Sequence, residues 1–113
     1  MDYKVTRGSA PQPFQRVGWF GCSQASLSTL QTSDASLSSA DHYVFHPGGG
    51  RELRSTQIET FLYVLSGQIS VRTPEEQTVL SAGDAIHLLS GCAIGLFNES
   101  MQDCEILAVH CKQ

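Results

Sequence analysis

Four histidines are the side chains of this sequence best suited to metal binding or proton transfer. His42 and His46 stand four residues apart in HYVFH, a segment whose apolar spacing is typical of a β-strand. Four strand residues span roughly 13 Å, whereas ligands of one zinc ion lie about 2.0–2.1 Å from the metal. A straight strand therefore keeps these two from chelating one ion. His87 and His110 stand alone, so an unconventional metal site built from the histidines is the weaker interpretation.

Other reactive groups lack recognisable partners. His87 and Tyr63 are the acid–base candidates on clearly predicted strands, and the sequence identifies no partner for either. No G-x-S-x-G occurs, and the glycines at 48–50 are not followed by lysine, which predicts a turn rather than a phosphate loop. The cysteines show no C-x-x-C spacing and are predicted to be free and packed. They are Cys22, Cys92, Cys104 and Cys111.

Length and composition predict one globular domain over residues 1–113. The chain is 41% hydrophobic and 16% charged, and its net charge is −4. Seven scattered Lys and Arg residues argue against a nucleic-acid partner. The sequence contains no run of 18 apolar residues, so no membrane span is predicted. Residues 1–7 lack the apolar core of a signal peptide, and a cytoplasmic location is therefore expected.

The elements that must position these groups are predicted to be short strands. Apolar residues alternate or come in short runs between Gly-rich turns, and helical periodicity is almost absent. Residues 1–16, which contain Pro11 and Pro13, are predicted to be an irregular arm. Residues 25–30 are either an edge strand followed by a turn at 32–34 or part of a mobile loop. Strands are expected at 17–20, 42–46 (ended by the turn at 47–50), 58–65, 68–72, 78–80, 85–89, 92–97 and 105–110.

Spaced motifs in the second half of the chain give a resemblance to a known family. The order PGGG, ETFLYVLSGQISV, LSAGDAIHLLSG and IGLFN, between about residues 47 and 98, resembles the cupin superfamily. The resemblance implies an all-β double-stranded β-helix, the cupin jelly-roll barrel, with its site inside. Gly83, Gly91 and Asn98 match the second cupin motif.

The resemblance also identifies the positions at which cupins carry metal ligands. Here they are occupied by Arg54, Thr56, Thr60 and Ile94. Glu59 precedes one of these positions, but alternation along a strand turns it to the other face. Four substituted positions leave no metal-binding set, so neither a metal nor another cofactor is expected.

Side-chain alternation predicts which residues line the barrel. If Thr60 faces the lumen, so does Leu62, with Ile94 and Leu96 across from them. Arg54 and Thr56 share this parity if no bulge intervenes, and Arg54 is the expected anchor for an anion; the alternative is a solvated loop. Arg51 is placed on the adjacent turn with little role. The predicted ligand-binding residues are Arg54, Thr56, Thr60, Leu62, Ile94, Leu96 and His87.

Two classes of function remain open. The favoured one is metal-independent binding of a small molecule, either an anionic metabolite or a sugar derivative. The alternative is an enzyme, either a metal-independent isomerase or epimerase or a metal-dependent oxygenase with non-standard ligands. A homodimer is expected, because Phe61, Tyr63 and Leu65 should face away from the lumen.

Overall fold

The fold is an all-β barrel, as the sequence predicts. The computed structural model describes residues 3–28 and 35–112, which contain nine strands and no helix. These are β1 (Gln12–Pro13), β2 (Trp19–Ser26), β3 (Leu37–Ser55), β4 (Thr60–Ser66), β5 (Gln68–Arg72), β6 (Gln77–Ser81), β7 (Ala85–Leu88), β8 (Ala93–Phe97) and β9 (Cys104–Cys111). Accordingly, no helix in the described part of the chain is long and apolar enough to cross a membrane.

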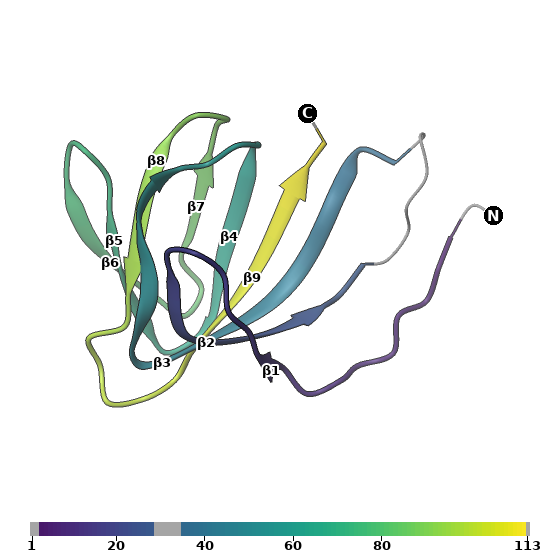
Figure 1. Cartoon of the computed structure of the whole chain (residues 1–113), viewed down its shortest axis with the longest axis horizontal. Coiled ribbons are helices and arrows are strands. Elements are labelled where there is room, and N and C mark those ends of the chain that lie inside the picture. Colours follow the sequence, from purple (N-terminus) through teal and green to yellow (C-terminus); the bar gives the residue numbers. More distant parts are fainter. Residues whose placement is uncertain (1–2, 29–34, 113) are drawn as a thin grey trace.

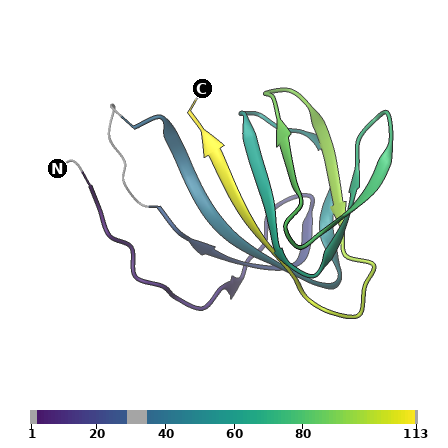
Figure 2. The same ribbon diagram turned by 180° about the vertical axis from the view of Figure 1, so that it is seen from behind.

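One curved antiparallel sheet makes up the barrel. Its strand order is β6-β5-β8-β3-β9-β4-β7, with β2 alongside β3 and β1 alongside β2. Figures 1 and 2 show this sheet curling into a barrel whose strands come together at one end and spread apart at the other. The nearly closed barrel confirms the expected jelly-roll fold.

Strand β3 is far longer than predicted. The turn expected at residues 47–50 does not end the strand, which continues to Ser55. Its first half pairs with β2 and β9, and its second half pairs with β8 and again with the start of β2. Figure 1 shows β3 bending at the closed end of the barrel between these halves. Glycine permits the bend, because a Cβ at Gly50 would collide with the Leu96 carbonyl oxygen and one at Gly49 with the Gly21 carbonyl oxygen.

In the N-terminal region one continuous strand, β2, covers the two separate segments expected there, and the short strand β1 lies in the arm predicted to be irregular. The segments at 17–20 and 25–30 merge into β2, which ends at Ser26, while residues 29–34 lie outside the described part. Gly21, at a φ of 59°, carries the bulge between Phe20 and Cys22 that keeps this strand continuous. Before it, residues 3–18 contain β1, an isolated bridge between Arg16 and Trp19 and a turn at 17–18, and the others have no regular secondary structure.

Alternation along β4 separates the core from the outer face. Thr60, Leu62 and Val64 are buried, whereas Phe61, Tyr63 and Leu65 are exposed. The largest fully buried side chains include Phe45, Ile69, Ile94 and Ile106, from four different strands. All four cysteines are free, with Cys22 and Cys104 buried.

Candidate functional site

A cavity of about 560 Å³ occupies the barrel interior and opens to solvent. Its walls come from β2, β3, β4, β7, β8 and β9, with Arg16 and residues 56–58 completing the lining. The polar lining residues are Arg16, Ser39, Asp41, Arg51, Arg54, Ser55, Thr56, Gln57, Thr60 and His110. The other half of the lining is apolar or aromatic, so polar groups converge on a space with hydrophobic walls, as is typical of small-molecule sites.

Six of the seven predicted ligand-binding residues line this cavity. They are Arg54, Thr56, Thr60, Leu62, Ile94 and Leu96. His87 is placed differently. Leu88 faces inward opposite Thr60, so alternation turns His87 outward opposite Phe61, where its Nε2 lies 2.6 Å from Glu59 Oε2. The imidazole is therefore engaged on the outer face and does not reach the lumen.

The positions of the two β3 arginines, Arg51 and Arg54, differ from those predicted. A bulge between Arg51 and Arg54 places them opposite Leu96 and Ile94, both lumen residues, so both arginines start on the lumen face. Without the bulge, residues three apart would face opposite sides. The expected position of Arg51 outside the site is therefore wrong.

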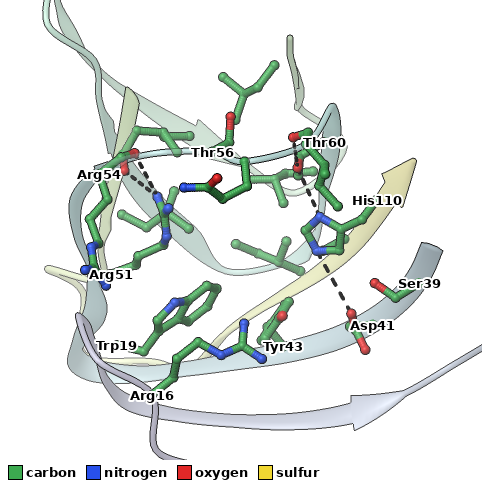
Figure 3. Close-up of a pocket in the computed structure, with 18 of the residues that line it drawn as sticks. Arg16, Trp19, Ser39, Asp41, Tyr43, Arg51, Arg54, Thr56, Thr60 and His110 are labelled. Atoms are coloured by element: carbon green, nitrogen blue, oxygen red, sulfur yellow. Dashed lines mark hydrogen bonds and ion pairs between the residues drawn. The ribbon is translucent and has the colours of Figure 1, made fainter. Parts of the chain in front are cut away.

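The two guanidinium groups then diverge, as Figure 3 shows. Arg54 turns to the rim, where Nη1 donates to the Val17 carbonyl oxygen at 2.6 Å and Nε lies 3.4 Å from Glu52 Oε1. Arg51 projects into the cavity, where Nη1 donates to the Ile94 carbonyl oxygen at 2.6 Å. Burial lowers the pKa of Arg51 from its usual value, which still leaves it charged at neutral pH.

Aromatic rings form the wall beside Arg51. The Trp19 ring stacks against Tyr43 and Phe45 with centroids 5.0 and 5.9 Å away. The guanidinium carbons of Arg51 and Arg16 lie 5.7 and 5.8 Å from the Trp19 ring centroid. Cation–π attraction therefore helps hold two positive charges at this side of the cavity.

A histidine that the sequence analysis left as an isolated residue lies on the other side. His110 Nδ1 is 3.0 Å from Thr60 Oγ1, and that hydroxyl donates its proton to the Ile58 carbonyl oxygen at 3.0 Å. With its one proton directed at the Ile58 carbonyl oxygen, the hydroxyl accepts from His110, and on this basis we assign the proton of the neutral ring to Nδ1. The lone pair on Nε2 then lies 4.0 Å from Asp41 Oδ2, a carboxylate on the lumen face of β3. His110 is thus arranged as a base within the cavity.

Burial lowers the pKa of His110, while Asp41 opposes this shift and the two arginines Arg16 and Arg51 reinforce it. Burial and Asp41 also raise the pKa of Tyr43 to about 12, so that hydroxyl stays protonated at neutral pH. The cavity thus combines a neutral base with a hydroxyl donor.

We expect His110 to titrate below the ordinary histidine value of about 6.5. As the pH falls through that value, the unfolded chain takes up a proton before folded His110 does, so this residue's contribution to stability is lost on acidification. NMR titration of the ring protons checks the pKa, and His110→Gln assigns the resonance. Urea unfolding between pH 7.5 and 5.5 should show a smaller loss of stability in His110→Gln than in the wild type. A pKa of 6.5 or above would contradict the expected burial effect.

The residues at the four metal-ligand positions of the resemblance do not fit a metal. Ile94 is 1% exposed and offers only hydrocarbon. The Thr60 hydroxyl donates to a carbonyl oxygen and accepts from His110, while the Thr56 hydroxyl donates to the Cys92 carbonyl oxygen at 3.0 Å. Arg51 adds a positive charge, which repels a cation. Within residues 3–28 and 35–112, no three His, Cys, Asp or Glu side chains are grouped to hold one.

The two histidines of HYVFH face the outer surface. His42 Nε2 lies 2.8 Å from Glu105 Oε1. His46 Nδ1 lies 3.0 Å from Asp103 Oδ1, and its Nε2 lies 3.1 Å from Ser23 Oγ, which matches the atom order of a serine-hydrolase triad. Ser23 is only 6% exposed, and its hydrogen bond to His46 joins β2 to β3. We interpret both groups as links between strands.

Comparison with known proteins identifies a family relationship. A family model described as a cupin domain matches residues 41–110. No curated protein sequence matches the chain.

Solved structures share the fold at low sequence identity. A predicted oxalate decarboxylase from Thermotoga maritima is 23% identical, with a TM-score of 0.83, over 97% of this chain and 100% of that one. The polyketide cyclase RemF from Streptomyces resistomycificus is 20% identical, with a TM-score of 0.80, over 100% of this chain and 81% of that one. An RmlC-like cupin from Shewanella frigidimarina is 16% identical, with a TM-score of 0.79, over 99% of this chain and 93% of that one. At these identities the likeness concerns the fold alone.

Proposed function

This chain belongs to the cupin domain family, whose sites lie inside the barrel, and from that premise we propose that it binds a small anionic molecule in its lumen without a metal. The observation that carries the proposal is the guanidinium of Arg51. It projects into a largely apolar cavity and, among the described residues, forms no ion pair with a carboxylate. A half-buried guanidinium without an ion-pair partner favours an anionic ligand, and its planar shape suits a carboxylate or phosphate.

Other charges support the same ligand class. Arg16, at the Trp19 ring, and Arg54, at the rim, add positive charge on the same side of the cavity, although the whole chain carries a net charge of −4. Charged groups that line a low-dielectric cleft concentrate ligands of the opposite sign. We therefore place the anionic group of the ligand beside Arg51 and Trp19.

A thermal-shift screen of small carboxylates and sugar phosphates tests this proposal on the purified protein. At a ligand concentration of about 100 times Kd, binding to the folded state contributes roughly 2.7 kcal/mol of stability, which is a readily measured rise in melting temperature. Neutral amides of any stabilising acid serve as matched controls and should have no effect. Chelator should leave the melting temperature unchanged, and elemental analysis should find no stoichiometric metal. If the protein contains a metal whose removal abolishes anion binding, the proposal that binding is independent of metal is wrong.

A second candidate is metal-independent proton transfer, which the His110 hydrogen-bond pattern favours. Nδ1 is held by Thr60, so Nε2 can accept a proton from a bound ligand, and the resulting imidazolium would face Asp41. Two proteins of similar fold, the polyketide cyclase RemF and the predicted oxalate decarboxylase, are compatible with an enzyme. In D₂O, an enzyme of this kind exchanges the acidic hydrogen of its ligand for deuterium. His110→Gln should abolish the exchange and leave ligand binding largely intact.

The homodimer remains a prediction. Phe61, Tyr63 and Leu65 lie on the outer face of β4 and are 39%, 36% and 46% exposed. Light scattering at tens of micromolar checks the prediction, and a monomeric mass would contradict it.

A further inference from the structure

The two sides of the cavity differ in shape, and this difference bears on which anion fits. Three rings of β2 and β3 have similar orientations. The planes of Trp19 and Tyr43 differ by 27°, those of Trp19 and Phe45 by 17°, and those of Tyr43 and Phe45 by 29°. The apolar residues from β4, β7, β8 and β9 are aliphatic, namely Leu62, Leu88, Ile94, Leu96, Ile106 and Ala108. The ligand space is therefore bounded by flat aromatic surface on one side and aliphatic surface on the other.

Polar groups lie at two separate places along the aromatic wall. Arg51 reaches into the cavity beside Trp19 at 5.7 Å. In Figure 3, His110 lies across the cavity from Arg51, with the Trp19 and Tyr43 rings along the side between them. Arg51 offers a cation, whereas neutral His110 offers a lone pair on Nε2. A ligand that satisfies both has an anion at one end and a hydrogen-bond donor at the other.

Resting on the function proposed above, we infer that the ligand is a planar conjugated acid with its carboxylate at Arg51, its flat face against the Trp19 ring, and a hydroxyl or acidic hydrogen directed at His110. The cavity of about 560 Å³ accommodates a ring of this kind with both substituents. Aromatic rings prefer offset stacking, which flat ligands achieve and puckered sugar rings do not. The inference thus favours planar acids over the sugar derivatives that the sequence left open.

The test compares two ligands that carry the same polar groups on different rings. One is para-hydroxybenzoate, and the other is its saturated analogue, cis-hydroxycyclohexanecarboxylate. Stacking should make the wild-type protein bind the planar acid roughly three- to tenfold more tightly in isothermal titration calorimetry. Trp19 is the single tryptophan of the chain, so its fluorescence should also respond to the planar acid.

Variants assign this preference to the aromatic wall. Trp19→Leu should reduce the ratio of the two affinities to about one while both acids still bind through Arg51. Trp19→Phe keeps a flat ring and should retain most of the preference, which separates loss of stacking from loss of fold. Phe20→Leu is the matched control, because Phe20 is the next residue of β2, is 44% exposed and does not line the cavity.

The outcomes separate this inference from the proposed function. Equal affinity of the wild type for the two acids overturns the planar ligand and leaves anion binding standing. The planar ligand is also overturned, and anion binding still stands, if a non-planar anion binds in the thermal-shift screen and para-hydroxybenzoate does not. If no anion binds at all, the planar-ligand inference and the proposed anion binding are both wrong. A planar preference that persists unchanged in Trp19→Leu also overturns the inference.

Discussion

Arg51→Ala should weaken binding of an anionic ligand by about ten- to a hundredfold. A charge-assisted hydrogen bond is worth roughly 1.5–3 kcal/mol, and Arg51 is the guanidinium that projects into the lumen. Its position beside Trp19 and beneath the Ile94 carbonyl oxygen restricts its rotamers, so little entropy is lost when a ligand binds. Titration calorimetry with any acid found by the thermal-shift screen measures the loss.

Arg54→Ala is the matched control, because it removes the same charge from the same strand. The Arg54 side chain is 43% exposed, donates to the Val17 carbonyl oxygen and lies beside Glu52. We expect at most a twofold change, most of it from the long-range field, which salt screens. Arg51→Lys should recover only part of the affinity, because lysine keeps the charge without the planar donor pair. Equal losses in the two alanine variants would mean that net charge alone attracts the ligand, and a loss confined to Arg54→Ala would restore the anchor predicted from the sequence.

The sequence could not predict which of these two arginines projects into the cavity. Alternation correctly places Thr60, Leu62, Ile94 and Leu96 on the cavity wall, since each lies in a regular strand. One bulge in β3 breaks the same rule and brings Arg51 inward. A bulge depends on how a strand meets its partner, which local residue order does not specify.

His110 was missed for a related reason. The sequence predicts its strand but contains nothing that pairs it with Thr60, fifty residues earlier, or with Asp41. The barrel fixes that register, and only then does an isolated histidine acquire a hydroxyl and a carboxylate as neighbours. Alternation did offer one usable signal: if His42 and His46 face outward, then Asp41, Tyr43 and Phe45 face the lumen.

The family motif predicts the fold because its matching residues stabilise the barrel, whereas the residues proposed to bind a ligand lie at other positions. Gly67 and Gly83 have φ angles of 80° and 93° and form the turns that end β4 and precede β7. Asn98 is 0% exposed and follows β8. Such residues persist in the motif here although the positions of the metal ligands hold other residues, because the barrel needs them whatever its lumen contains.

Asn98→Ala should therefore be among the most destabilising single changes in this chain, at roughly 3–5 kcal/mol. The side-chain amide donates to the Phe45 and Gln102 carbonyl oxygens at 2.8 and 2.7 Å. Its oxygen accepts from the backbone N–H and the hydroxyl of Ser100 at 2.9 and 2.7 Å. Alanine leaves the buried Phe45 carbonyl group without this donor and removes the side-chain hydrogen bonds that hold residues 98–102 together. Urea unfolding measures the loss, and Ser100→Ala, which removes one hydroxyl from the same network, should cost only about 1 kcal/mol.

Asn98→Asp gives the same network a pH dependence with a definite sign. The carboxylate has the shape of the amide but faces two carbonyl oxygens, so burial and repulsion should raise its pKa above the ordinary value of about 3.9. The unfolded state then releases its proton first as the pH rises, and the variant loses stability relative to wild type between about pH 4 and pH 7. Urea midpoints of the two proteins at both pH values measure this loss. Because a protonated carboxyl still donates one hydrogen bond, the deficit should be smallest at the acidic end. A deficit independent of pH would mean that the loop rearranges to expose residue 98, and the Phe45 and Gln102 carbonyl groups would then not depend on this side chain.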